Sequence, residues 1–211
     1  MWNWLVSALG SEATVVLFDG SPFHPQPSAL FDMADELGVT LFGVSAKYID
    51  ACAKAGLKPM ETHKLSTLKT ICSTGSTLIP ESFEYVYQNI KRDVHLQSMS
   101  GGTDLCGCLV AGDPTGPVNK GEIQKAALGM GIEILNEHGG RVRKGEQGEL
   151  VCASVFPSMP VRFLNDPDDE KYREAYFNKF EGKWHQGDFA EWTLSNGICL
   201  LYTSPSPRDN R

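Results

Sequence analysis

The amino-acid sequence predicts an α/β fold, with a mostly parallel sheet and flanking helices in its first half and a smaller β-rich subdomain after it. Two observations lead to this fold class. Over residues 1–110, short apolar runs of strand length alternate with segments of helical periodicity, which is typical of βαβ units. After about residue 110, glycines become frequent and helical patterns scarce. We therefore expect an α/β sheet portion over 1–110 and a β-rich subdomain over 111–198.

Composition and charge argue against several classes of protein. The 211 residues are 41% hydrophobic and 21% charged, which is typical of a globular chain. A net charge of -7 argues against a nucleic-acid partner, which requires a basic face. No apolar run is long enough to span a bilayer, and the first residues lack the basic start of a secretory signal. The six cysteines are scattered, as reduced thiols are, so we expect a cytoplasmic protein.

The first half of the chain predicts strands and helices in alternation. Ser28 and Ser45 precede two of the helices and can cap them by accepting a backbone N–H bond. Gly38 and Gly56 follow those helices, where glycine readily takes the left-handed conformation that ends a helix. The predicted strands cover residues 13–18, 40–44, 67–72 and 94–97, and the predicted helices cover 28–37, 45–55 and 81–91.

The second half predicts strands and turns with one helical segment. Residues 131–143 indicate a β-hairpin, and residues 148–152 indicate a further strand. The acidic segment 166–179 carries aromatic residues at helical spacing, which favours packing over ligand binding. Residues 183–192 predict a strand, a turn and another strand. Residues 199–211 have no periodicity, and we expect them to be a loose tail that is not native to the protein.

Two polar loops follow strands of the predicted parallel sheet. They span residues 73–77 and 98–104, and ligands of such sheets bind beyond the carboxyl ends of the strands. In the second loop, two glycines let a ligand approach the backbone. Thr103 can then hydrogen-bond a phosphate oxygen, and Asp104 can hold Mg²⁺, which prefers oxygen ligands. This loop is a candidate for binding a magnesium nucleotide, and a plain turn is the alternative.

Five short motifs stand in a fixed order along the chain. They are Ser73-Thr74-Gly75-Ser76, Ser100-Gly101-Gly102-Thr103-Asp104, Lys120-Gly121-Glu122-Ile123-Gln124, Gly148-Glu149-Leu150-Val151 and Gly187-Asp188. Together they resemble the acyl-adenylate-forming (AMP-binding) enzyme superfamily, and within it the enzymes that activate acetoacetate. The resemblance covers residues 1–198 and implies that the chain is an internal part of the large N-terminal domain of an adenylate-forming enzyme.

The resemblance implies an acid–thiol ligase. Family members activate a carboxylic acid with ATP to an acyl-adenylate and pyrophosphate, and then transfer the acyl group to coenzyme A. The implied ligands are ATP, Mg²⁺, coenzyme A and acetoacetate or a similar short acid, with no nucleic acid and no membrane span. The family's phosphate loop, hinge and catalytic lysine domain have no match in the 211 residues, so we expect the chain alone to be inactive.

The resemblance also assigns roles to residues. Thr103 and Asp104 match the catalytic residues at the α-phosphate and Mg²⁺, with Asp104 as the metal ligand, and Asp188 matches the carboxylate that binds both ribose hydroxyls. The implied nucleotide-binding set is Gly75, Ser76, Thr77, Ser98, Met99, Ser100, Gly102, Thr103 and Asp188, and the implied acyl pocket is lined by Thr74, Gly101 and Gly102. We expect Gly75, Thr103 and Asp188 to converge around one AMP-sized hollow.

Two other classes of function stay open. A non-catalytic α/β module that binds a nucleotide, or that serves interactions alone, would keep the same loops without chemistry. A metal-dependent phosphohydrolase could use Asp104 and Asp188, but it needs more clustered carboxylates than the sequence contains. A phosphate loop and a lysine domain in the neighbouring coding sequence would separate the ligase from the non-catalytic module.

Overall fold

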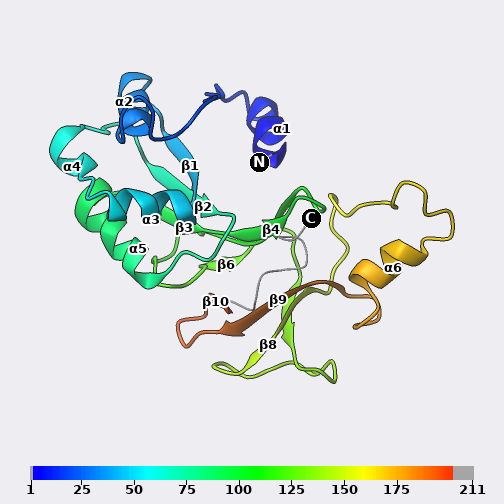
Figure 1. The fold of residues 1–211 in the computed structure, drawn as a ribbon. Helices are drawn as coiled ribbons and strands as arrows, with labels where there is room; N and C mark the ends of the chain where they lie inside the picture. Colours follow the sequence, from blue (N-terminus) through cyan, green and yellow to red (C-terminus); the bar gives the residue numbers. More distant parts are fainter. Residues whose placement is uncertain (1, 202–211) are drawn as a thin grey trace. The chain divides into compact units, whose positions relative to one another are not determined.

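A computed structural model describes residues 2–201, with side chains from residue 5 onward. The chain divides into two compact units, an N-terminal unit up to Ser98 and a C-terminal unit from Met99, and each is described by itself. Figure 1 labels most of their helices and strands. Among the residues described, we find no helix with both the length and the apolar character needed to cross a bilayer.

The N-terminal unit contains a three-stranded parallel sheet in the order β1-β2-β3 (Figure 1). The strands are β1 (Leu41–Ser45), β2 (Thr70–Thr74) and β3 (His95–Ser98). Ser73 of β2 lies opposite Ser98 of β3. Because the strands are parallel, β2 and β3 end at the same edge of the sheet, and both predicted polar loops begin at that edge.

Helices precede and connect these strands, and the three predicted helices are confirmed. The helices are α1 (Trp2–Gly10), α2 (Ala29–Glu36), α3 (Ala46–Lys54), α4 (Pro59–Thr62) and α5 (Pro80–Tyr85), which continues into the π-helical turn η1 (Val86–Ile90). Ser45 Oγ accepts the backbone N–H of Tyr48 at 3.1 Å, as expected of an N-cap. Gly56 follows α3 with φ +67°, the left-handed conformation that glycine favours at a helix end.

Three features of the N-terminal unit differ from the predictions. Residues 13–18 form no strand, and Leu17 is 75% exposed. An apolar run becomes a strand only where a neighbouring strand pairs with its backbone, and within residues 2–201 none pairs with this segment. Residues 2–10 form a helix that no pattern indicated. Ser28 Oγ donates to Asp32 Oδ2 at 3.0 Å instead of capping α2.

The C-terminal unit contains two antiparallel sheets, which confirms the β-rich part of the fold class. One sheet has the order β4-β5-β6 and the other the order β10-β9-β8-β7 (Figure 1). The strands are β4 (Ser100–Gly102), β5 (Gly107–Ala111), β6 (Lys125–Ala126), β7 (Ile132–Leu135), β8 (Gln147–Cys152), β9 (Trp184–Trp192) and β10 (Ile198–Leu201), and the helix is α6 (Glu170–Tyr176).

Aromatic packing joins α6 to the larger sheet. The ring of Tyr176 stacks on that of the fully buried Trp184, with centroids 3.7 Å apart and planes 13° apart. Phe163 and Tyr172 meet edge to face at 5.6 Å beside them, and Phe156 meets Trp184 in the same way at 5.7 Å. The aromatic residues at helical spacing therefore build a core, as the sequence predicts.

The compact C-terminal unit and the predicted β-rich subdomain are defined by different features of the chain. Contacts divide the chain between Ser98 and Met99, whereas the pattern changes near residue 110, and that boundary stays a prediction. Residues 199–201 belong to β10 and pair with β9, although the sequence assigns them to a loose tail. They are ordered because β9 presents a free edge with which their backbone can bond. The rest of the predicted tail lies outside the described residues.

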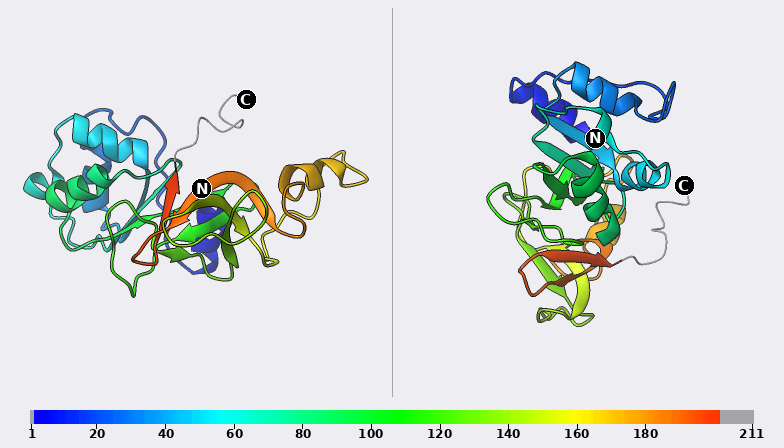
Figure 2. Two further views of the ribbon diagram at one scale, coloured as in Figure 1. Left: turned by 90° about the horizontal axis from the view of Figure 1, so that it is seen from below. Right: turned by 90° about the vertical axis from the view of Figure 1, so that its left-hand side faces the viewer.

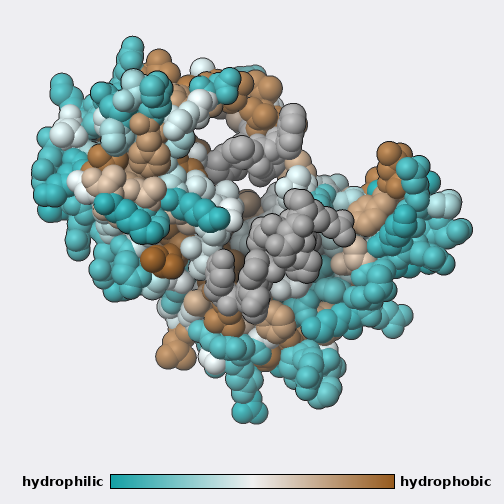
Figure 3. Space-filling view, in the orientation of Figure 1, coloured by the Kyte–Doolittle hydropathy of each residue, from teal (hydrophilic) through white to brown (hydrophobic). Residues whose placement is uncertain are grey.

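Large apolar side chains lie exposed on the loop before α6. Val161 and Leu164 are each 91% exposed, and Val155 is 85% exposed. Figure 3 shows brown, hydrophobic atoms beside the largely hydrophilic surface of α6.

Glu133 of β7 is held by two cations. Its Oε1 accepts a 3.0 Å hydrogen bond from Arg141 Nε, and Lys183 Nζ pairs with its other oxygen. The hydrogen bond from Lys183 is the largest influence and holds the pKa of this carboxyl below its ordinary value of 4.5. Partial burial opposes the shift, and Arg141 adds to it. The ionised carboxylate therefore stabilises the folded sheet.

Lowering the pH is expected to remove the contribution of the Glu133 carboxylate to the stability of the folded chain. A carboxyl whose pKa is lowered by folding stabilises the native state above its unfolded pKa and loses that contribution as the pH falls through the folded pKa. Glu133→Gln should therefore make the free energy of unfolding less dependent on pH below about 4.5. Urea denaturation at a series of acidic pH values measures the slope, and equal slopes for the two proteins would contradict the expectation.

Candidate nucleotide site

The Gly-Gly-Thr-Asp segment forms a β-hairpin. Strand β4 ends at Gly102, and a tight turn over residues 103–106 leads into β5. The carbonyl of Thr103 accepts the N–H of Cys106 at 3.1 Å, which closes the turn. The side chains of Thr103 and Asp104 are exposed at its tip. The turn therefore presents a hydroxyl and a carboxylate side by side to solvent, where a ligand can reach them.

The two glycines before this turn have packing reasons of their own. A Cβ on Gly101 would lie 2.0 Å from the carbonyl oxygen of Gly107 and 2.6 Å from Cα of Cys108, so strand β5 leaves no room for a side chain. A Cβ on Gly102 would lie 3.2 Å from Gln186 Oε1. Close strand pairing thus requires glycine at 101 whichever ligand binds. The predicted role of both glycines in an acyl pocket stays a prediction.

Gly187 and Asp188 lie on a large bulge of β9. Glu149 of β8 is paired with Phe189, and Val151 of β8 is paired with His185. Between these two pairs β8 has a single residue, whereas β9 has Gln186, Gly187 and Asp188. The two additional residues leave the ladder and bend the strand, which curves visibly in Figure 2 (left view, orange).

The predicted strand, turn and strand over residues 183–192 are therefore one continuous strand, β9, with a bulge at its centre. Gly187 takes φ +83° within the bulge, a conformation that glycine adopts without strain. The sequence pattern placed the irregularity at the correct residues, but it predicted a turn where the structure has a bulge. A bulge and a turn both need glycine, and pairing to β8 on both sides distinguishes them.

Gln186 joins this bulge to β4. Its Nε2 donates to Asp188 Oδ2 at 2.8 Å and to the carbonyl oxygen of Gly101 at 3.3 Å. The half-buried carboxylate of Asp188 is thereby held beside the hairpin that carries Thr103 and Asp104. Sequence reasoning did not single out Gln186. The available signal was a polar side chain directly before Gly-Asp in an otherwise aromatic strand.

The remaining predicted residues lie in the N-terminal unit, apart from Met99 and Ser100. Thr74 ends β2, and Gly75 follows it with φ +86° and open space where a side chain would stand. Ser76 and Thr77 are half-buried, and Ser98 is buried at the end of β3. In the C-terminal unit, Met99 is buried with its Sδ 3.6 Å from Cys108 Sγ, and Ser100 begins β4. The convergence of Gly75 with Thr103 and Asp188 stays a prediction.

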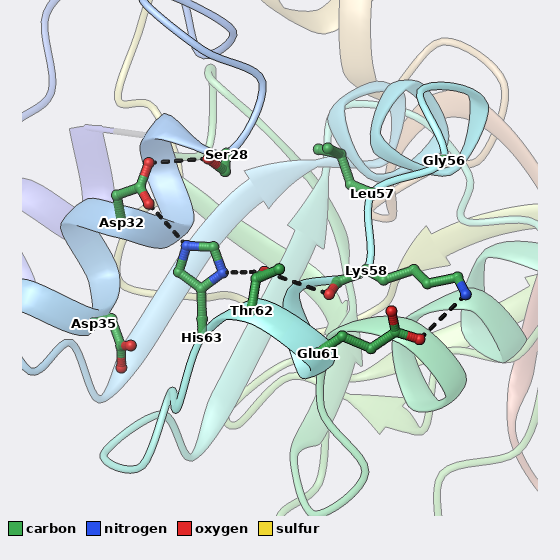
Figure 4. Close-up of a pocket in the computed structure, with 9 residues that line it drawn as sticks. All are labelled: Ser28, Asp32, Asp35, Gly56, Leu57, Lys58, Glu61, Thr62 and His63. Atoms are coloured by element: carbon green, nitrogen blue, oxygen red, sulfur yellow. Dashed lines mark hydrogen bonds and ion pairs between the residues drawn. The ribbon is translucent and has the colours of Figure 1, made fainter.

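A hollow of about 700 Å³ in the N-terminal unit contains none of these residues (Figure 4). Its lining is Ser28, Asp32, Asp35, Gly56, Leu57, Lys58, Glu61, Thr62 and His63. His63 Nε2 lies 2.9 Å from Asp32 Oδ1, and hydrogen bonds from Gln26 first and His63 second lower the pKa of Asp32. Asp35 accepts backbone N–H bonds from the chain after His63. These groups bind one another and fasten α2 to the segment after α4.

Comparison with known proteins places the chain in a family. The sequence model described as "AMP-binding enzyme" matches residues 1–158. The chain belongs to the AMP-binding enzyme family. It is 54% identical over 200 residues to acetoacetyl-coenzyme A synthetase of Rhizobium meliloti, covering 95% of this chain and 31% of that protein. It is 51% identical over 202 residues to acetoacetyl-CoA synthetase of Gallus gallus, covering 95% and 30%.

Solved structures agree with this family membership. The acetoacetyl-CoA synthetase of Streptomyces lividans matches with a TM-score of 0.87 and 40% sequence identity, covering 94% of this chain and 31% of that one. The α/β fold class is thereby confirmed. The chain spans just under a third of the length of these relatives.

Proposed function

We propose that this chain is the nucleotide-binding part of an ATP-dependent acid–thiol ligase that activates acetoacetate or a similar short acid. The observation that carries the proposal is the link through Gln186, which holds the Asp188 carboxylate beside the hairpin of Thr103 and Asp104. The choice of acetoacetate as the acid rests on relatives named acetoacetyl-CoA synthetase, which match 95% of the chain. We infer a cytoplasmic location because none of the six cysteines, all of which lie within the described residues, forms a disulfide.

Each residue of the proposed site has a chemical task. The two oxygens of Asp188 would accept hydrogen bonds from the two adjacent ribose hydroxyls of AMP. The hydroxyl of Thr103 would donate to an α-phosphate oxygen, and Gly75, Ser76 and Thr77 would line the adenine. These contacts place the α-phosphorus for in-line attack by the acid's carboxylate, with pyrophosphate as the leaving group. Positioning and charge neutralisation provide most of the catalysis in such a displacement.

Asp104 suits a magnesium ion that arrives with the nucleotide. Within residues 2–201 there is no group of three or more His, Cys, Asp or Glu side chains that could hold a metal by themselves. Mg²⁺ is commonly held by one or two carboxylates together with phosphate oxygens, so a single exposed carboxylate beside a phosphate site fits it. When bound, the ion would neutralise charge on the phosphates.

The test of this proposal is nucleotide binding by the purified 211-residue chain. We expect AMP binding by calorimetry but no exchange of pyrophosphate into ATP in the presence of acetoacetate. The reason is that the resemblance assigns the phosphate loop and the adenylation lysine to segments outside these residues. Absence of AMP binding would contradict the nucleotide site, and exchange by the chain alone would contradict this assignment of the missing groups.

A further inference from the structure

Glu149 of β8 is a buried carboxylate with two partners. Its side chain is 3% exposed, its Oε1 lies 3.0 Å from Nδ1 of His185, and its Oε2 pairs with Lys179 Nζ. A carboxylate is costly to bury unless it is paired and hydrogen-bonded, and this one is both. Its place in the sheet therefore requires an explanation beyond stability.

His185 is bonded at both ring nitrogens. Its Nε2 lies 2.9 Å from Asn178 Oδ1. The amide of Asn178 is oriented by its own Nδ2, which donates to Glu174 Oε1 at 2.9 Å. Each ring nitrogen thus faces a side-chain oxygen, so the imidazole is held from two sides.

The residues that Glu149 contacts lie at the two ends of the bulge that carries Asp188. His185 immediately precedes the bulge, and Phe189, which immediately follows it, is paired with Glu149. Lys179, the second partner of Glu149, places its ammonium 5.6 Å from the ring centroid of Phe189. Glu149 therefore contacts one end of the bulge directly and the other end through strand pairing and Lys179.

We infer that Glu149 is a positioning residue for Asp188. It holds His185 and Phe189 at a fixed separation, and this separation sets how far the Gln186–Asp188 segment projects from the sheet. Glu149 touches no ligand in this role. The consequence for the ribose contact rests on the proposed function, whereas the effect on the bulge does not.

The test compares two glutamate-to-glutamine variants of the 211-residue chain. Glu149→Gln removes the charge beside the bulge. Glu133→Gln removes a carboxylate from β7 of the same sheet that also bonds two cations, and it serves as the matched control. We expect AMP affinity to fall about tenfold in Glu149→Gln and to stay unchanged in Glu133→Gln. Equal affinities in the two variants would overturn the inference.

A second readout needs no nucleotide. We expect the amide resonance of Gly187 to shift, and its hydrogen exchange to accelerate, in Glu149→Gln but not in Glu133→Gln. If the unmodified chain fails to bind AMP, the proposed function fails, and the Gly187 signal still decides the inference. An unchanged Gly187 signal in a folded Glu149→Gln chain would overturn it.

A second pair of variants covers the case in which Glu149→Gln does not fold. Lys179 is 40% exposed and Lys183 is 31% exposed, so both can be replaced by methionine with little burial of new surface. We expect Lys179→Met to shift Gly187 in the same direction as Glu149→Gln, and Lys183→Met to leave it in place. Identical Gly187 signals in the two lysine variants would overturn the inference.

Discussion

Replacing Asp188 by asparagine is expected to weaken AMP binding by about 10- to 100-fold while the C-terminal unit stays folded. A carboxylate offers two charged acceptor oxygens to two adjacent hydroxyls, and an amide offers only one neutral oxygen. Hydrogen bonds to charged groups contribute about 1.5–3 kcal/mol each, which sets the size of the effect. Gln186 Nε2 now donates to Asp188 Oδ2. In the variant, the single amide oxygen would have to accept from Gln186 as well as from the ribose, because the amide nitrogen is a donor.

Calorimetric titration with AMP measures this effect. Glu191→Gln is the matched control, because Glu191 lies on the same strand beyond the bulge and is paired in register with Gln147 and Cys199. It makes the same change of charge, and we expect its affinity to equal that of the unmodified chain. An Asp188→Asn chain that binds AMP as tightly as the control would show that Asp188 does not bind the ribose.

Replacing Gly101 by alanine is expected to lower the free energy of unfolding by about 3 kcal/mol. The added methyl group would lie 2.0 Å from the carbonyl oxygen of Gly107 and 2.8 Å from its carbonyl carbon, so two paired backbones must separate. No flexible side chain at this point can absorb the overlap. The change would also move the carbonyl that Gln186 contacts, and AMP binding should weaken along with stability.

Urea denaturation of the two proteins measures the loss. Gly10→Ala is the control, since a Cβ there meets nothing within 4 Å and the residue does not have a positive φ. We expect that change to alter stability by less than about 1 kcal/mol. Equal midpoints for Gly101→Ala and Gly10→Ala would mean that β4 and β5 can separate at little cost.

Much of the local structure could be predicted from residue patterns. Ser45 caps α3, Gly56 ends it, and the strands of the parallel sheet follow short apolar runs, because these signals act within a few residues. Residues 13–18 show where such reasoning fails. Their apolar pattern suits a strand, but strand formation depends on a partner elsewhere in the chain, and a pattern carries no information about one.

The same distinction between local signals and contacts of distant segments applies to the candidate site. The chemical groups and the family resemblance could be predicted from the sequence, because the Gly-Gly-Thr-Asp segment and the Gly-Asp pair can be recognised from residue type and order. The bulge at Gly187 and Asp188 could not be predicted in this way, nor could the contact of Glu149 with His185, 36 positions further along the chain. Cross-strand contacts depend on register, and a two-residue bulge changes the register without leaving a periodic pattern in the sequence.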